Sequence, residues 1–280
     1  MSYPSNNNTS QNSELFANLV TQAQYAAYEN SIARNLVRVY DVPMNAGKVV
    51  QIPVWAGISA ELITDESAAT AKTTNTTAPT ITLAEHVVYH QVTDMLRDSA
   101  YSDVFAQIGD QSGRAIAEAM DAQVFAQFAN LSGSTTSVSS LTVDDIFDRV
   151  ATLRANKLTG PFYCVVHPAA AGKLKKALTA TTSYQNATQV ASDVLQGFYI
   201  GTIAGCQIFE SALVPVADGV ATCGVFTQGA LGHAMRGGID MNTLYLPAAR
   251  ATDVVLKAVA GATTIQSTFG VRITAEGTIN

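Results

Sequence analysis

The residues best suited to chemistry are the four histidines, and two of them are spaced as a metal-binding pair would be on a helix. His86 and His90 form an H-x-x-x-H pattern, which on a helix places two imidazoles on one face and suits zinc. Here they lie in an alternating, β-branched segment, where positions four apart share a strand face but stand about 13 Å apart. One metal ion cannot join them, so we expect both to pack against neighbouring strands or to face solvent.

The pair Cys164 and His167 raises the question of a thiolate–imidazole dyad. Residues three apart on a strand point to opposite faces, and the apolar run around Cys164 keeps a thiol unreactive. We therefore expect a core cysteine and a histidine that caps the next helix. With Cys206 and Cys223 the chain has three scattered cysteines, which is typical of a reducing compartment rather than of a disulfide framework.

Short catalytic and phosphate-binding motifs are absent from the sequence. It contains no Gly-x-Ser-x-Gly elbow, Walker loop, Gly-x-Gly-x-x-Gly fingerprint or Cys-x-x-Cys pair. The acidic residues Glu61, Asp65 and Glu66 do not have the spacing of a calcium loop. The sequence therefore predicts a protein that is not an enzyme and has no catalytic, cofactor or metal site.

The composition indicates that other protein covers much of the surface. Hydrophobic residues make up 48% of the 280 residues and only 14% are Asp, Glu, Lys or Arg, against about 25% in an average soluble protein. No apolar run reaches the roughly 18 residues of a membrane span, and the N-terminus lacks the basic start and apolar centre of a signal peptide. A net charge of −6 without a basic stripe argues against tight, sequence-reading nucleic-acid binding.

The element with the clearest consequence is a long two-stranded arm over residues 37–93. Its outgoing strand is predicted over 48–55 and its return strand over 81–93, with a tip rich in Thr, Ala, Asp and Glu over 56–80. The return strand alone spans roughly 40 Å at about 3.3 Å per residue. An isolated hairpin is marginally stable at best in water, so we expect a neighbouring subunit to hold this one.

Two helices flank the arm. An amphipathic pattern predicts one over residues 14–37, and helical spacing of apolar residues predicts a very long one over 99–130. Gly109 and Gly113 in the long helix allow another backbone to approach closely.

The second half of the chain predicts a mixed α+β layout without an internal repeat. Thr142 and Asp145 resemble a capping box at the start of a helix, and Pro168 suits the first turn of another. The glycines between the predicted strands, Gly232 and Gly237 among them, are expected to mark turns. Strands are predicted over residues 162–166, 199–203, 206–209, 223–226, 242–246, 253–260 and 263–271.

Six residues are candidates for contacts between subunits. The tail over residues 1–13, which contains Tyr3, has a composition that stays disordered unless a partner pins it. Trp55, the only tryptophan, is either an inter-subunit anchor, since Trp is enriched in interface hot spots, or packed within its own chain. The charged residues of the arm's tip either form salt bridges to a neighbour or are simply solvated; they are Glu61, Asp65, Glu66 and Lys72.

The order of these elements resembles the tailed-bacteriophage major capsid protein family, which has the Hong Kong 97-type fold. The stretch from Leu141-Thr-Val-Asp-Asp-Ile-Phe-Asp-Arg-Val-Ala-Thr-Leu-Arg to Phe162-Tyr-Cys-Val-Val-His-Pro is similar to the family's helix, strand and His-Pro helix. The segment Gly201-Thr-Ile-Ala-Gly-Cys-Gln-Ile-Phe-Glu-Ser-Ala-Leu-Val-Pro215 and the closing strands are similar too. The resemblance covers essentially the whole chain and rests on the order of elements more than on any short motif.

The resemblance implies a wedge-shaped subunit with four parts. The first is an N-terminal arm and helix over residues 1–40, and the second is an extended hairpin, the E-loop, over 41–93. A peripheral domain with the long spine helix takes residues 94–138 and 247–280, and an axial domain takes 139–246.

The resemblance also implies a function. Copies of the chain would form hexamers and pentamers of an icosahedral virion capsid, assembled in the bacterial host cytoplasm, which encloses double-stranded DNA without sequence-specific binding and involves no membrane. Because the chain reaches its hairpin by about residue 40, a separate scaffolding protein is expected beside a portal, and a cement protein is left open. No motif near Lys72 supports a covalent crosslink between subunits. The alternative is an encapsulin, a nanocompartment shell of the same fold; a soluble enzyme or secreted adhesin is disfavoured.

Overall fold

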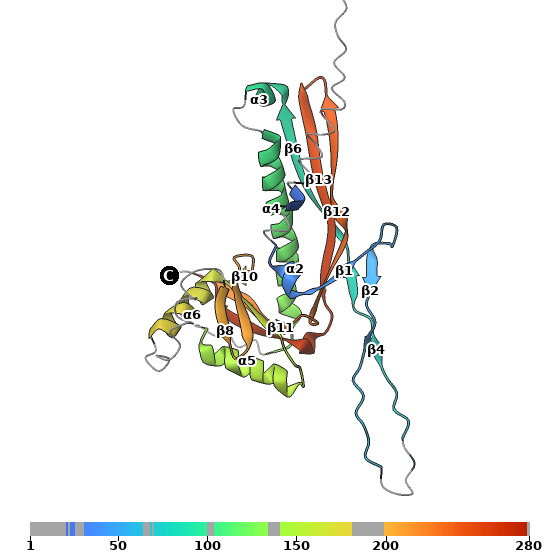
Figure 1. Cartoon of the computed structure of the whole chain (residues 1–280), viewed down its shortest axis with the longest axis vertical. Coiled ribbons are helices and arrows are strands. Elements are labelled where there is room, and N and C mark those ends of the chain that lie inside the picture. The colour runs from blue at the N-terminus through green and yellow to red at the C-terminus, as the bar shows by residue number, and fades with distance from the viewer. Residues whose placement is uncertain are drawn as a thin grey trace, which may run out of the picture.

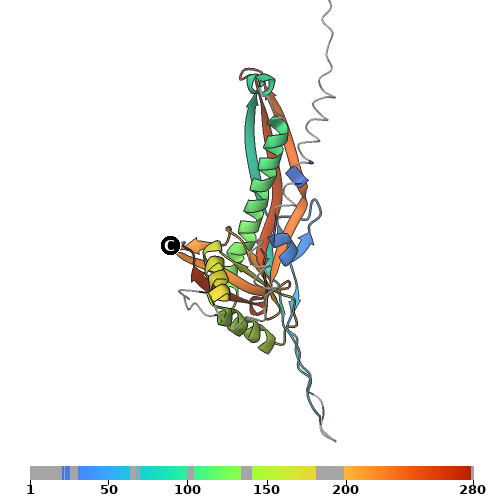
Figure 2. The ribbon, with the colours of Figure 1, turned by 60° about the vertical axis from the view of Figure 1, so that its left-hand side comes forward.

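The computed structural model describes residues 21, 23–25, 31–63, 68, 70–99, 104–133, 141–180 and 199–278. These residues form two parts, each built on a sheet, and a hairpin that projects beyond both of them (Figure 1). The view turned by 60° shows the same separation of the hairpin from the two parts (Figure 2).

The first part is a four-stranded sheet with the long helix α4 (Val104–Phe125) packed along it. The first strand in the sheet order runs parallel to its neighbour and the others are antiparallel. Alternate residues of the sheet and apolar residues of α4, such as Ile116 and Met120, share one buried cluster, as expected for an amphipathic helix on a half-buried sheet. In sheet order the strands are β1 (Arg38–Asp41), β12 (Leu231–Leu246), β13 (Ala251–Thr264) and β6 (Ala84–Thr93).

The second part is a six-stranded mixed sheet with helices α5 (Val143–Ala155) and α6 (Pro168–Ala180) packed against it. The predicted capping box of α5 is confirmed: Thr142 accepts a hydrogen bond from the Asp145 amide, and the Asp145 carboxylate accepts one from the Thr142 amide. Five strands follow one another in the sheet in the order β10 (Val216–Ala217), β11 (Val220–Thr227), β7 (Phe162–Val166), β9 (Cys206–Glu210) and β8 (Tyr199–Ile203). The sixth strand, β14 (Gly270–Glu276), also pairs with β11.

The hairpin is shorter than the sequence predicts. Its paired strands are β2 (Val49–Gln51) with β5 (Thr80–Thr82), and β3 (Val54–Trp55) with β4 (Thr76–Thr77). Most of the predicted return strand over residues 81–93 is a strand, but its place in the hairpin is wrong from residue 84 onward, because β6 pairs along its whole length with β13. Regular alternation continues through both strands, so periodicity alone does not reveal where the chain leaves one sheet and enters another. We use the name hairpin for residues 42–83.

The long helix is also divided. The structure has a short helix α3 (Asp94–Ser99), then α4, then a 3-10 turn η1 (Ala126–Asn130), where one helix over 99–130 was predicted. The predicted role of Gly113 is confirmed: a Cβ atom built there would lie 2.3 Å from the carbonyl oxygen of Ala23. Of the helix predicted over residues 14–37, the described residues 21 and 23–25 are helical, as is α2 (Ala33–Leu36).

Two predicted strands near the C-terminus need correction. Strand β12 begins at Leu231 rather than near residue 242 and therefore contains Gly232. A Cβ atom built on Gly232 would lie 2.7 Å from the Ile265 side chain, so a larger residue does not fit there. The predicted strand over 263–271 is wrong, because β13 ends at Thr264 and a 3-10 turn η3 (Ser267–Phe269) precedes β14. The prediction that Gly232 marks a turn is therefore wrong, because this glycine makes room for the packed side chain of Ile265.

These pairings change the expected division of the chain into domains. Strand β12, placed in the axial domain over 139–246, belongs to the four-stranded sheet with β13. Strand β14, placed in the peripheral segment 247–280, pairs with β11 in the six-stranded sheet. Each of these two strands thus belongs to the other sheet from the one expected by its position in the chain, because long-range pairing decides which sheet a strand joins.

Candidate assembly interface

The root of the hairpin is fixed to the four-stranded sheet by a small apolar cluster. Val42, Ile81, Leu83 and Ala234 are buried together. The Val42 amide also donates to the Met235 carbonyl at 2.9 Å, which continues the pairing of β1 with β12 by one residue. The root is therefore held within the chain.

Beyond the root, the hairpin exposes its apolar residues. Leu62 is 96% exposed and Ile58 is 62% exposed, although burying such a side chain stabilises a fold by about 1.5–3 kcal/mol. We call Trp55, Ile58, Leu62 and Ile63 the hairpin patch. An exposed apolar group on a projecting arm is typical of a surface that another protein covers.

Trp55 is the largest member of the hairpin patch. It pairs with Thr76 in the two-residue ladder of β3 and β4 and remains 66% exposed. Packing of Trp55 within its own chain, one of the two interpretations from the sequence, is therefore wrong. A role as an inter-subunit anchor stays a prediction.

The charged candidates of the tip are placed only in part. The Lys72 ammonium donates to the Ser59 carbonyl at 2.8 Å and to the Ser59 hydroxyl at 3.2 Å, so it ties the two sides of the tip together. Glu61 is exposed. Tyr3, Asp65 and Glu66 lie outside the described residues.

A second exposed apolar group lies on the face of the four-stranded sheet opposite α4. Val87 and Tyr89 on β6 point there, since the alternate residues such as Val88 pack on the α4 side. Asp253 of the neighbouring strand accepts a hydrogen bond from Tyr89, which raises the pKa of the phenol above its ordinary 10.0. This face was not predicted, because the alternation of β6 does not distinguish a strand of the sheet from a strand of the free arm.

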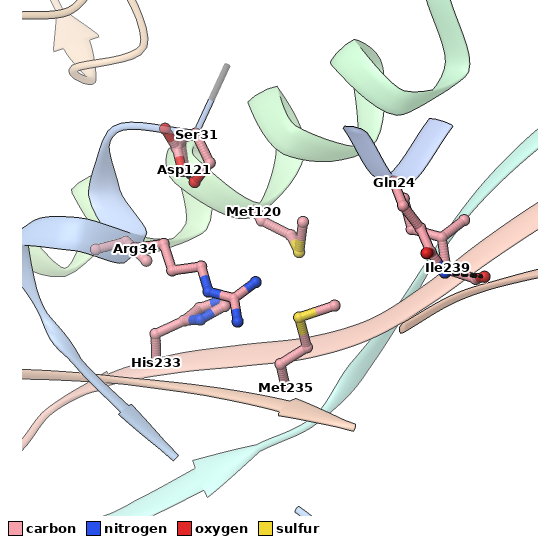
Figure 3. Close-up of a pocket in the computed structure, with 9 residues that line it drawn as sticks. Gln24, Ser31, Arg34, Met120, Asp121, His233, Met235 and Ile239 are labelled. Atoms are coloured by element: carbon pink, nitrogen blue, oxygen red, sulfur yellow. Dashed lines mark hydrogen bonds between the residues drawn. The ribbon is translucent and has the colours of Figure 1, made fainter. Parts of the chain in front are cut away.

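A small cavity lies between the N-terminal segment, α4 and β12 (Figure 3). Its volume of about 20 Å³ has room for about one water molecule. His233 lines it and is 3% exposed, and neither ring nitrogen has a hydrogen-bond partner among the described residues. Burial, with Arg34 and His86 nearby, lowers the pKa of His233 to about 4. A cavity this small is no substrate site.

Asp121 in the same cavity wall anchors the start of α2. Its carboxylate accepts hydrogen bonds from the Ser31 hydroxyl at 2.7 Å and from the amides of Ile32 and Ala33 at 2.8 and 3.2 Å. Burial raises the pKa of Asp121 above its ordinary 3.8, and these donors partly offset that effect. The arrangement holds the N-terminal segment against α4 and provides no group aimed at a substrate.

The other histidines and the cysteine considered for chemistry contact groups that pack or cap the fold. His86 and His90 share one face of β6 as predicted, but that face lies on the α4 side instead of packing only on strands or facing solvent, and His86 lies 3.4 Å from the Gln123 side chain. His167 caps α6 as predicted, accepting from the Ala169 amide at 3.3 Å. Cys164 is buried, and its neighbour Cys206 and burial raise its thiol pKa well above 9.0. Across the part of the chain that the structure describes, no three His, Cys, Asp or Glu residues are grouped to hold a metal ion.

This combination of a long helix on a sheet, a second mixed sheet and a projecting apolar hairpin can be compared with known proteins. The sequence profile of the family described as "Phage capsid protein" matches residues 76–277. The chain belongs to this phage capsid protein family. The family's role is structural and not enzymatic, and the match does not favour the encapsulin alternative. No curated protein matches in sequence, and no described helix is long and apolar enough to cross a membrane.

Solved capsid structures share the fold of this family member. The capsid of cyanophage P-SCSP1u has a TM-score of 0.70 at 17% identity, with 89% of each chain covered. The head structure of Helicobacter pylori bacteriophage KHP40 also has a TM-score of 0.70, at 9% identity, covering 89% of this chain and 91% of that one. Mycobacterium phage Che8 gives 0.64 at 19% identity, with 84% and 86% covered. The predicted α+β phage capsid fold is thereby confirmed.

Proposed function

We propose that the chain is the major subunit of an icosahedral virion shell, in which hexamers and pentamers of this one protein enclose double-stranded DNA. The observation that carries the proposal is the hairpin patch. Its apolar side chains are exposed beyond both buried cores of the chain, and a second copy, repeated by symmetry, offers them a consistent partner. Family membership supports the same conclusion.

The two parts of the fold correspond in this proposal to the two domains of such a subunit. The four-stranded sheet with α4 would be the peripheral domain, and the six-stranded sheet with α5 and α6 the axial domain. The hairpin would be the E-loop that lies over a neighbour. Trp55, Glu61 and Lys72 are the described residues that we assign to that contact, together with Tyr3, Asp65 and Glu66.

The proposed partners follow from the same role. The net charge of −6 supports containment of DNA by enclosure rather than by tight binding. A separate scaffolding protein and a portal would assist assembly in the host cytoplasm, and a cement protein would be an additional partner. Lys72 is engaged by Ser59 of its own tip, which supports a shell without a crosslink at this lysine.

Electron microscopy of the expressed protein tests the proposal. The chain is expressed alone and together with its neighbouring genes, and both preparations are imaged by negative staining. We expect closed shells or capsomer rings tens of nanometres across. A strictly monomeric product under both conditions would overturn the proposal, and a ladder of multimers on a denaturing gel would contradict the absence of a crosslink.

A further inference from the structure

Strand β12 contains a bulge at the point where the hairpin leaves the sheet. Arg236 pairs with Val259 and Asp240 pairs with Lys257, so three residues of β12 stand opposite the single residue between those partners. Gly237 has a φ of +65°, a left-handed conformation that glycine adopts without strain. Bulges bend a strand and redirect its side chains.

The side chain of Arg236, the last regularly paired residue before the bulge, holds the hairpin root. The Arg236 guanidinium donates a hydrogen bond to the Gly47 carbonyl. Gly47 follows the turn in which the Ala46 amide donates to the Pro43 carbonyl, and the carbonyl of the next residue, Lys48, accepts from the Leu83 amide at 2.9 Å across the root. The arginine therefore connects the bulge to the first residues of the outgoing strand.

Two further contacts meet at the same bulge. The Met44 methyl lies 3.4 Å from a Cβ built on Gly237, so the root turn packs directly on the bulge. On the other side, the Gln24 side chain donates to the Ile239 carbonyl at 3.4 Å, and its nitrogen lies 3.1 Å from a Cβ built on Gly238. The N-terminal segment and the hairpin thus reach one short stretch of β12.

We infer that the bulge at Arg236–Asp240 is the joint that sets the direction in which the hairpin leaves the subunit, with Arg236 as its positioning residue. The inference rests on the proposed function, since the direction of an inter-subunit arm fixes the angle between neighbouring copies. Arg236 still pairs in register with Val259, so it lies on the same side of β12 as Ala234 of the root cluster, and its guanidinium reaches Gly47 from there. The bulge begins at the next residue and bends β12 where the root turn packs on Gly237.

The test compares Arg236→Ala with Arg236→Lys and Lys48→Ala. Lysine keeps a cation that can reach the carbonyl. Lys48→Ala is the matched control, because it removes one positive charge from the same root, and no described residue bonds to that exposed side chain. Gly237→Ala is a second variant that strains the bulge while leaving Arg236 in place.

Amide hydrogen exchange of the unassembled subunit gives the first readout. We expect Arg236→Ala to speed exchange over residues 42–50 by about three- to tenfold, the worth of one hydrogen bond, while α5 is unchanged. Arg236→Lys should restore part of the protection and Lys48→Ala should match the wild type. Equal exchange in Arg236→Ala and wild type would overturn the inference, and so would equal acceleration in the Lys48→Ala control.

Shell geometry gives the second readout. Cryo-electron microscopy of shells should show a changed or mixed diameter for Arg236→Ala and Gly237→Ala, with wild-type diameter for Lys48→Ala. Wild-type shells from both bulge variants would refute the role of the joint. If the wild-type protein itself forms no shells, the proposed function fails, and the exchange experiment still decides whether Arg236 holds the root.

Discussion

The six-stranded part and the hairpin treat their large apolar side chains in opposite ways. Phe128 is fully buried, and its ring centroid lies 5.4 Å from those of both Phe125 and Phe226. In the hairpin, Leu62 and Trp55 are 96% and 66% exposed. The first region completes its core within one chain, whereas the second keeps apolar area available for another chain. We therefore expect the stability of the subunit and the affinity between subunits to depend on different residues.

The largest effect is expected in the buried aromatic cluster. Phe128→Ala should lower the free energy of unfolding by about 3–5 kcal/mol, because a cavity remains where the ring packed. Urea unfolding of the unassembled subunit measures it. Phe147→Ala is the matched control, since Phe147 on α5 is 46% exposed, and it should cost about 1 kcal/mol or less. Equal losses for the two phenylalanines would break the comparison.

The next effect concerns pH and His233. Burial lowers its pKa to about 4 from an ordinary 6.5, so the unfolded chain binds more protons than the folded one between these values. Stability from this residue is fully present above pH 6.5 and declines as the pH falls toward 4. From pH 7 to pH 5 we expect a loss of about 2 kcal/mol in the free energy of unfolding.

The variant His233→Leu isolates this effect. The raised pKa of Asp121 acts in the opposite direction, and the difference between wild type and variant removes its contribution. Urea unfolding at both pH values should show a smaller loss in the variant. The same pH slope in both proteins would exclude His233 as its origin.

Trp55→Ala tests the exposed hairpin, where we expect a large effect on assembly and a small effect on stability. Because the ring is exposed in the subunit, the free energy of unfolding should change by less than about 0.5 kcal/mol. Assembly should fail or weaken, since an anchoring Trp contributes about 2 kcal/mol or more at an interface. Light scattering follows assembly, and Trp55→Phe should retain part of it. Unfolding of the Ala variant, or normal shells from it, would contradict an anchoring role.

The smallest effect is expected at the start of α5. Thr142→Ala removes the side chain that accepts from the Asp145 amide and should cost about 1 kcal/mol. Thr142→Ser keeps the hydroxyl and should recover most of that loss in thermal unfolding. Assembly at a temperature where both variants are folded should be unchanged. A selective loss of assembly would show that this helix end also contributes to an interface.

Local signals in the sequence located several elements correctly. Thr142 with Asp145 identified the start of α5, His167-Pro168 identified the start of α6, and Gly113 identified a close backbone contact. Each of these depends on residues near in sequence or on the absence of a side chain. The hairpin patch was partly readable too, since Ile58, Leu62 and Ile63 interrupt an otherwise polar tip.

Sheet membership was decided only by the tertiary structure. An alternating pattern shows that residues 84–93 form a strand, but not that β13, from the other end of the chain, is its partner. The same limit applies to Gly237, which lies in a bulge where β12 pairs with β13 and also contacts the root turn and Gln24. The sequence by itself determined the α+β class, the capped helices and a projecting arm. Which strands pair, and where the arm is attached, depend on contacts between distant residues that no local pattern encodes.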